Sequence, residues 1–203
     1  MPDTPRGPRS TPAGLVLTPG AGADRNQSAL VAIDAALDEV GVAVRRIDFP
    51  YRIAGRRSPD RPPVLIAAVA EAADSLATEL GVAPKRVALG GRSMGGRMCS
   101  MAVADGLQAA ALVLVSYPLH PPGRPDQLRV EHFARLDVPC LFVSGTKDTF
   151  ATPEELQREV RVIPGPVTTV FLDGGDHGLR KKDDEVAEAV RHWLVRGRRT
   201  KAG

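Results

Sequence analysis

The chain has 203 residues, 43% of them hydrophobic, which suffices for one sizeable core but not for two comfortable domains. No apolar run approaches the length of a membrane-spanning helix, and residues 1–13 lack the apolar segment of a signal peptide. The only two cysteines, Cys99 and Cys140, lie in apolar segments, so we expect small buried side chains and no disulfide framework. These features predict a cytoplasmic protein without a membrane segment.

The sequence pI of about 9.1 would suit a nucleic-acid partner, but the positions of the charges argue against one. Six basic residues and one acidic residue lie in two segments that we interpret as a disordered leader (1–13) and a basic tail (196–203). The remaining chain has 21 basic and 23 acidic residues, so its net charge is slightly negative. Aromatic residues make up only 4% of the chain, which leaves little material for stacking on bases. The sequence predicts no nucleic-acid partner.

Short apolar runs alternate with amphipathic segments between residues 14 and 195, a pattern typical of a parallel sheet covered on both faces. In chain order we predict a strand at 15–18, a helix ending before Gly41, a strand at 42–49, a loop at 50–63, a helix ending before Gly81, a strand at 87–89, a helix at 98–104, a strand at 110–116, a polar loop at 117–135, a strand at 139–144, a helix starting at Thr152, a strand at 167–172 and a helix at 183–195. The expected architecture is one α/β domain, residues 14–195, with about six mostly parallel strands and no separate lid domain.

The most informative motif is Gly91-Arg92-Ser93-Met94-Gly95, which follows a strand-like run and precedes a helical segment. In a nucleophile elbow of this form, the sharp turn exposes the serine hydroxyl at the end of the sheet, and the glycines relieve crowding. The alternative is a glycine-rich turn with an ordinary serine. The strand before it and the helix after it favour the elbow, so Ser93 is the candidate nucleophile.

A serine nucleophile needs an imidazole to accept its proton and a carboxylate to orient that imidazole. His177 follows the last predicted strand and Asp148 follows the one before it, so both lie at the sheet edge where parallel α/β sheets bind ligands. The chain order Ser93, Asp148, His177 suits a catalytic triad. Asp148 as a simple turn residue and His177 as a surface residue remain alternatives. Other candidates for the acid and the base are Asp173, Asp176, His120, His132 and His192.

An oxyanion intermediate requires two backbone N–H donors positioned in advance. One is expected from Met94, directly after the nucleophile, and the other from Ala21 in the glycine-rich turn after the first strand. That turn is alternatively glycine-rich for backbone reasons alone.

Together, these motifs resemble the small bacterial α/β hydrolases of the dienelactone-hydrolase-like group. They are also similar to an α/β-hydrolase-like domain found in a testis-expressed protein and in a chromatin-complex subunit. The matching stretches are LTPGAG at 17–22, DFPYR at 48–52, GRSMGGR at 91–97, SYPLH at 116–120, SGTKD at 144–148 and GDH at 175–177. The resemblance implies an α/β-hydrolase fold with Ser93, Asp148 and His177 as its triad. One departure concerns the oxyanion turn: many relatives have His-Gly where this chain has Pro19-Gly20, so a bracing side chain is missing.

The sequence therefore predicts a serine hydrolase that cleaves an ester, thioester or related acyl bond of a small molecule. The alternative from another class is a catalytically silent α/β-hydrolase scaffold that binds a partner or ligand. We expect no metal and no organic cofactor, because the histidines and cysteines show no ligand spacing.

Several basic residues fall in loops at the expected active-site edge, which suggests a substrate with a negative charge, since arginine matches carboxylate and phosphate geometry. The alternative is that they are solvated loop charges or partners of surface carboxylates. The candidate substrate-binding residues are Arg56, Arg57, Arg92, His120 and Arg124.

Overall fold

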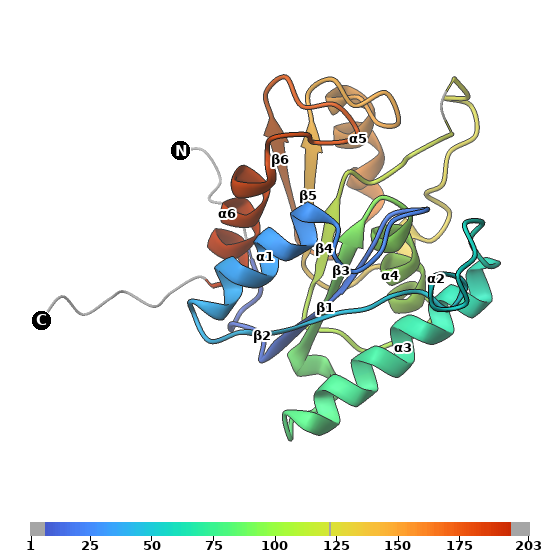
Figure 1. Cartoon of the computed structure of the whole chain (residues 1–203). Helices are drawn as coiled ribbons and strands as arrows, with labels where there is room; N and C mark the ends of the chain where they lie inside the picture. Colours follow the sequence, from blue (N-terminus) through green and yellow to red (C-terminus); the bar gives the residue numbers. More distant parts are fainter. Residues whose placement is uncertain (1–6, 122, 196–203) are drawn as a thin grey trace, which may run out of the picture.

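A computed structural model of the chain describes residues 7–121 and 123–195. Its centre is one six-stranded sheet in which every neighbouring pair is parallel, with the strand order β2-β1-β3-β4-β5-β6 (Figure 1). The strands are β1 (Gly14–Thr18), β2 (Ala43–Arg46), β3 (Val87–Arg92), β4 (Leu112–Val115), β5 (Cys140–Gly145) and β6 (Val167–Leu172). The predicted α/β architecture is confirmed, with no separate lid domain in the described part of the chain.

Helices cover both faces of the sheet, with α1 and α6 together on one face and α3 and α4 on the other (Figure 1). The helices are α1 (Ser28–Asp38), α2 (Pro50–Ile53), α3 (Pro62–Glu79), α4 (Met94–Ala104), α5 (Pro153–Glu159) and α6 (Asp183–Leu194), with short 3-10 turns at Pro84–Arg86, Phe133–Arg135 and Val160–Val162. Among the described residues, no helix combines the length and the apolar character needed to cross a membrane.

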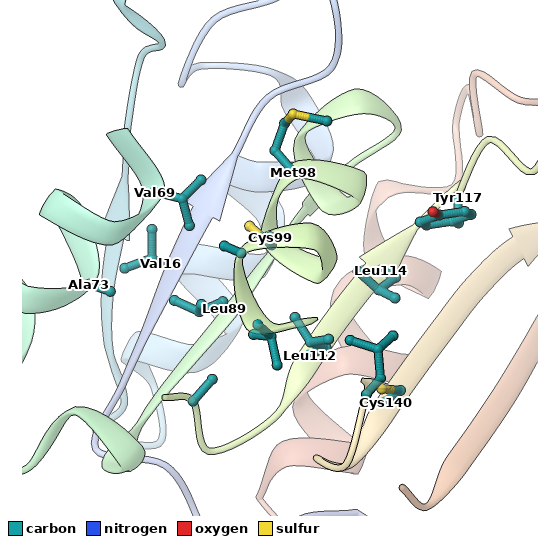
Figure 2. Close-up of a cluster of buried hydrophobic side chains, with 14 of the residues drawn as sticks. Val16, Val69, Ala73, Leu89, Met98, Cys99, Leu112, Leu114, Tyr117 and Cys140 are labelled. Carbon is teal, nitrogen blue, oxygen red and sulfur yellow. The ribbon is translucent and has the colours of Figure 1, made fainter. Parts of the chain in front are cut away.

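Alternating side chains of the central strands divide between two hydrophobic clusters, because successive residues of a strand face opposite sides of the sheet. Val16 packs toward α3 and α4, whereas Leu15 and Leu17 pack toward α1 and α6, and all three are fully buried. Figure 2 shows part of the first cluster, where Cys99 and Cys140 lie among aliphatic side chains. Both cysteines are buried and free, as predicted.

The expected helix boundaries hold where specific end signals were present. Gly41 and Gly81 have φ angles of 71° and 63°, the left-handed conformation that glycine adopts readily after a helix. Thr152 begins α5 with a complete capping box, in which its hydroxyl accepts from the Glu155 amide and the Glu155 carboxylate accepts from the Thr152 amide. Local hydrogen bonding thus fixes these ends.

Other boundaries differ from the predictions. Helix α2 forms inside the predicted loop at 50–63; at four residues it is too short for a periodic apolar pattern. The helix after the serine begins at Met94 rather than at residue 98, because the elbow leads directly into α4. Residues 1–6 and 196–203 of the predicted leader and tail lie outside the described residues. Ser10 and Thr11 accept hydrogen bonds from the Arg86 guanidinium, so this part of the predicted leader is attached to the domain.

Candidate active site

Ser93 occupies the turn between the end of β3 and the start of α4, with φ of 50° and ψ of −117°. A non-glycine residue rarely adopts positive φ, and such strain persists only where the surrounding structure enforces it. Close packing enforces it here. A Cβ atom at Gly95 would lie 2.5 Å from the Pro19 carbonyl oxygen, and one at Gly91 would overlap with the Thr18 hydroxyl. The glycines of the motif therefore let the elbow approach the end of β1.

A continuous hydrogen-bonded chain links the three predicted triad side chains. Ser93 Oγ lies 2.9 Å from His177 Nε2, and His177 Nδ1 lies 3.0 and 2.9 Å from the two carboxylate oxygens of Asp148. These distances suit a base that accepts the serine proton and an acid that orients the base. The structure brings all three predicted residues together.

The surroundings of Asp148 and His177 fix both side chains. Asp148 is only 2% exposed, and its Oδ1 accepts a hydrogen bond of 2.9 Å from the Phe150 amide. The Phe150 ring stacks on the imidazole with a centroid distance of 3.9 Å and an interplanar angle of 22°. The carboxylate and the imidazole are therefore held by contacts beyond their own hydrogen bond.

The sheet explains why two loops so far apart in sequence meet. Strands β5 and β6 are parallel neighbours, and Asp148 and His177 follow their carboxyl ends. The Lys147 amide donates to the Gly175 carbonyl at 2.8 Å, which ties the two loops together. A side chain at Gly145 would overlap with the Gly175 backbone, so this close approach requires glycine.

The rival acid Asp173 and the rival base His132 have other partners. Among the described residues, the only carboxylate hydrogen-bonded to His177 is that of Asp148, and Asp173 instead accepts from Thr146. His132 Nε2 lies 2.7 Å from the buried Ser100 hydroxyl, and burial lowers the pKa of His132 to about 4. The structure therefore favours Asp148 and His177 over these alternatives.

The predicted oxyanion donors have free amides. Within the described residues, neither the Ala21 nor the Met94 N–H has a hydrogen-bond acceptor. The amides on either side of Ala21 are occupied: Gly20 N–H donates to Gln27 Oε1 at 3.0 Å, and Gly22 N–H donates to the Tyr51 hydroxyl at 3.1 Å. Hydrogen bonds thus fix the residues before and after Ala21, whose own N–H stays available as a donor.

Gln27 and Tyr51 are residues that the sequence analysis missed. Tyr51 belongs to the DFPYR stretch that carries part of the family resemblance, but its contact with the turn at 19–24 depends on the pairing of β1 with β2. Spacing along the chain could not reveal this contact. The side chains of Gln27 and Tyr51 therefore brace the turn that has Pro19-Gly20 in place of His-Gly.

Three of the five candidate substrate-binding residues have partners within the protein. Arg56 pairs with Asp60 at 2.8 Å, and the Arg92 guanidinium donates to the His177 carbonyl at 2.5 Å. The buried His120 has its Nδ1 2.9 Å from the Pro121 carbonyl and its Nε2 3.5 Å from Glu155. Arg57 and Arg124 are exposed. The partners of Arg56, Arg92 and His120 favour the alternative of paired groups at these three positions, and substrate binding by the set stays a prediction.

Within residues 7–121 and 123–195, no group of three or more His, Cys, Asp and Glu side chains is arranged to hold a metal ion. The residues that meet at the sheet edge are one hydroxyl, one imidazole, one carboxylate and backbone amides.

The parallel sheet, the strained serine turn and the absence of a lid among the described residues define an α/β hydrolase. The chain belongs to the family described as "Alpha/beta hydrolase domain", which matches residues 11–196.

Solved structures with low sequence identity share the fold. The dienelactone hydrolase of Anabaena variabilis is 18% identical with a TM-score of 0.71, covering 92% of this chain and 87% of its own. An alpha-beta serine hydrolase homologue from Coxiella burnetii is 20% identical with a TM-score of 0.69, covering 94% and 88%. A serine hydrolase without a lid from Xanthomonas campestris is 17% identical with a TM-score of 0.71, covering 93% and 85%.

Epoxide hydrolase A of Mycobacterium tuberculosis is 36% identical over 61 residues, which are 30% of this chain and 19% of that protein. The match spans about a fifth of that relative.

Proposed function

We propose that the protein is a serine hydrolase that cleaves an ester, thioester or related acyl bond of a small molecule through an acyl-enzyme. The observation that carries the proposal is the hydrogen-bonded chain from Ser93 through His177 to Asp148, with both links near 3 Å. The family supports hydrolysis in general, and the site supports the choice of an acyl substrate. A hydroxyl nucleophile with a base and two free amides suits acyl transfer.

In the proposed mechanism, His177 Nε2 takes the proton of Ser93 as Oγ attacks the substrate carbonyl carbon. The Met94 and Ala21 amides donate to the oxygen that becomes negatively charged. When the tetrahedral intermediate collapses, the imidazolium of His177 returns its proton to the leaving group, and an ester bond to Ser93 remains. Water then attacks this ester with His177 again acting as base, which releases the acid and restores the serine.

Asp148 accepts a hydrogen bond from His177 Nδ1 throughout these steps. It therefore keeps Nε2 free to accept the serine proton, and it stabilises the imidazolium when that forms. Its burial at 2% exposure strengthens this electrostatic interaction, because little water screens the pair.

The competing proposal is a catalytically silent scaffold that keeps the fold but performs no chemistry. A scaffold without chemical demand has no reason to hold a serine at φ of 50° in hydrogen-bond contact with an imidazole that is itself bound to a buried carboxylate. These features favour the enzyme.

The same proposal includes a small-molecule partner and a cytoplasmic location. The free buried thiols of Cys99 and Cys140 support the cytoplasmic location. The relationship to the testis-expressed and chromatin-complex domains stays a prediction.

A fluorophosphonate probe tests the proposal on the purified full chain. The probe forms a bond from phosphorus to an activated serine oxygen and releases fluoride, so we expect labelling that peptide mass spectrometry maps to Ser93. Ser93→Ala should remove the labelling. Ser100→Ala is the matched control, because Ser100 also touches an imidazole but is fully buried. Folded protein that stays unlabelled, and that hydrolyses none of a panel of short-chain esters, lactones and thioesters, would support the scaffold instead.

A further inference from the structure

We propose that Arg92 is a positioning residue that holds the main chain of His177 against the nucleophile elbow; this inference rests on the proposed function. Arg92 is the last residue of β3 and immediately precedes Ser93. Its Nη2 donates to the His177 carbonyl oxygen at 2.5 Å. A hydrogen bond from a charged donor is shorter and stronger than a neutral one. The residue before the nucleophile is thus bonded to the main chain of His177, whose imidazole must contact Ser93.

The loop that carries His177 needs such a contact. Before His177, the Gly175 carbonyl accepts from the Lys147 amide, which ties the loop to the end of β5. After it, Leu179 is buried at φ of 47° and Lys181 has φ of 62°, conformations that non-glycine residues seldom adopt. Within the described residues, the bond to Arg92 is the only hydrogen bond that the His177 main chain makes. The strained segment after His177 is therefore anchored next to the imidazole by Arg92.

The Arg92 side chain also lies near the oxyanion turn. A Cβ atom built on Gly20 would lie 3.5 Å from Arg92 Nη1, which is ordinary contact distance. The guanidinium, which extends from the elbow after β3, therefore lies close to the turn after β1 and is hydrogen-bonded to the loop after β6. The elbow, the oxyanion turn and the loop of His177 must all be correctly placed for acyl transfer, and all three lie near this side chain. A misplacement on the order of 1 Å can lower a rate about 100-fold.

The surroundings of Arg92 argue against its binding an anionic substrate. Burial lowers the pKa of its guanidinium, and the negative charges of Asp148, Asp176 and Asp183 act in the opposite direction. Its Nη2 is already hydrogen-bonded to the His177 carbonyl, and the negative charges of Asp148, Asp176 and Asp183 act against the approach of a further anion. The side chain is thus engaged with protein groups, and its role is separable from substrate charge.

Steady-state kinetics on matched neutral and carboxylate-bearing esters test this role. For Arg92→Met we expect kcat to fall about 10- to 100-fold with both esters while KM stays within about twofold, because misplacement of the base affects the chemical step. Arg92→Lys should recover most of kcat, since an ammonium can donate to the same carbonyl. Arg135→Met is the matched control: Arg135 pairs with Asp105 at the far end of α4 and should leave both constants unchanged.

Two outcomes would overturn the proposal: a folded Arg92→Met enzyme with wild-type kcat, or a loss confined to KM for the charged ester. Should Arg92→Met fail to fold in thermal unfolding, Arg92→Gln decides in its place by the same split between kcat and KM. Labelling of Ser93 by fluorophosphonate distinguishes a failure of the role of Arg92 from a failure of the proposed function. If wild type is labelled and the Arg92 variants are fully active, only the role of Arg92 fails; if wild type is neither labelled nor active, the proposed function itself fails.

Discussion

At the scale of single residues, Asp148 has the most clearly defined role to test. Its carboxylate accepts from His177 Nδ1 and from the Phe150 amide, so Asp148→Asn keeps the shape but places an NH₂ donor or a neutral oxygen against the imidazole. We expect kcat/KM to fall by a factor on the order of 10³ to 10⁴, because His177 loses its tautomer control and its counter-charge. Ester hydrolysis measures this loss. Near-normal activity in Asp148→Asn together with a loss in Asp176→Asn would make Asp176 the acid.

Tyr51 offers a second residue-scale test, because a single hydroxyl connects it to the oxyanion turn. Tyr51→Phe removes the acceptor of the Gly22 amide without changing the fully buried ring. The turn loses one of its two braces, so we expect kcat/KM to fall about 5- to 20-fold with little change in KM, less than the loss of a whole oxyanion donor.

Tyr117→Phe is the control for that substitution. Tyr117 is also a buried tyrosine with one hydrogen bond to the backbone, in which its hydroxyl donates to the Arg129 carbonyl. Both variants should lose about 1 kcal/mol of folding free energy with one hydrogen bond, but only Tyr51→Phe should lose activity. Equal kinetic effects of the two substitutions would show that the hydroxyl of Tyr51 supports the fold rather than the turn.

At the scale of elements, the long segment between β4 and β5 is held on α4 by a buried pair, Ser100 and His132. The Ser100 hydroxyl donates to the Arg97 carbonyl, so it accepts from His132 Nε2–H. Burial, followed by the positive charge of Arg97, lowers the pKa of His132 to about 4. Smaller effects come from Glu131 and Asp105, which raise it, and from Arg135, which lowers it.

This buried pair predicts an acid-sensitive contribution to stability. Because the pKa of His132 is lower in the folded chain than the ordinary value of 6.5, the unfolded chain binds the proton more readily. Stability from His132 is therefore fully present above pH 6.5 and is lost as the pH falls through about 4. Between pH 7 and pH 5 the loss should be on the order of 2 kcal/mol.

Urea unfolding of wild type and His132→Gln at both pH values measures that loss. The variant should lack this part of the pH dependence, whereas His192→Gln, which alters an exposed histidine of α6, should keep it. Identical pH dependence in wild type and His132→Gln would contradict the assignment.

The sequence predicts those parts of the site that depend on strand ends and on local end signals. Ser93, Asp148 and His177 could be placed because each follows an apolar strand, and parallel strands bring their carboxyl ends to one edge. The capping box at Thr152 is equally local. The braces Gln27 and Tyr51 were invisible, since their contacts depend on loop paths that no periodicity encodes. The partners of charged loop residues could not be predicted for the same reason: Asp60, the partner of Arg56, lies in the same loop, but only the folded backbone shows the pairing.

At the scale of the whole molecule, the strand order explains where the site forms. The chain starts inside the sheet at β1, adds β2 on one side, and then continues from β3 to β6 on the other. The connection after β1 leads to β2 on one side, and the connection after β3 leads to β4 on the other side. Such a reversal leaves a crevice at the carboxyl ends of β1 and β3. The oxyanion turn follows β1 and Ser93 follows β3, while the acid and the base follow β5 and β6. Every component therefore depends on long-range pairing of the sheet.

The charge of the whole molecule gives the last prediction, which concerns substrate charge. The body between the predicted tails has slightly more acidic than basic residues, so no long-range field attracts an anion to it. A preference for anionic substrates must come from exposed groups near the carboxyl edge, of which Arg57 and Arg124 remain from the predicted set.

We expect a carboxylate-bearing ester to exceed its neutral analogue in kcat/KM by about 3- to 10-fold at low salt. The difference should shrink at 0.5 M salt and in Arg57→Ala/Arg124→Ala, because exposed charges are screened within about 10 Å at 0.1 M salt. The double variant Arg135→Ala/Arg161→Ala removes the same charge from two exposed positions in the short 3-10 turns before β5 and β6, and it controls for the change in net charge. Equal kcat/KM for the two esters at low salt in wild type would refute the prediction and leave a neutral acyl substrate as the better choice.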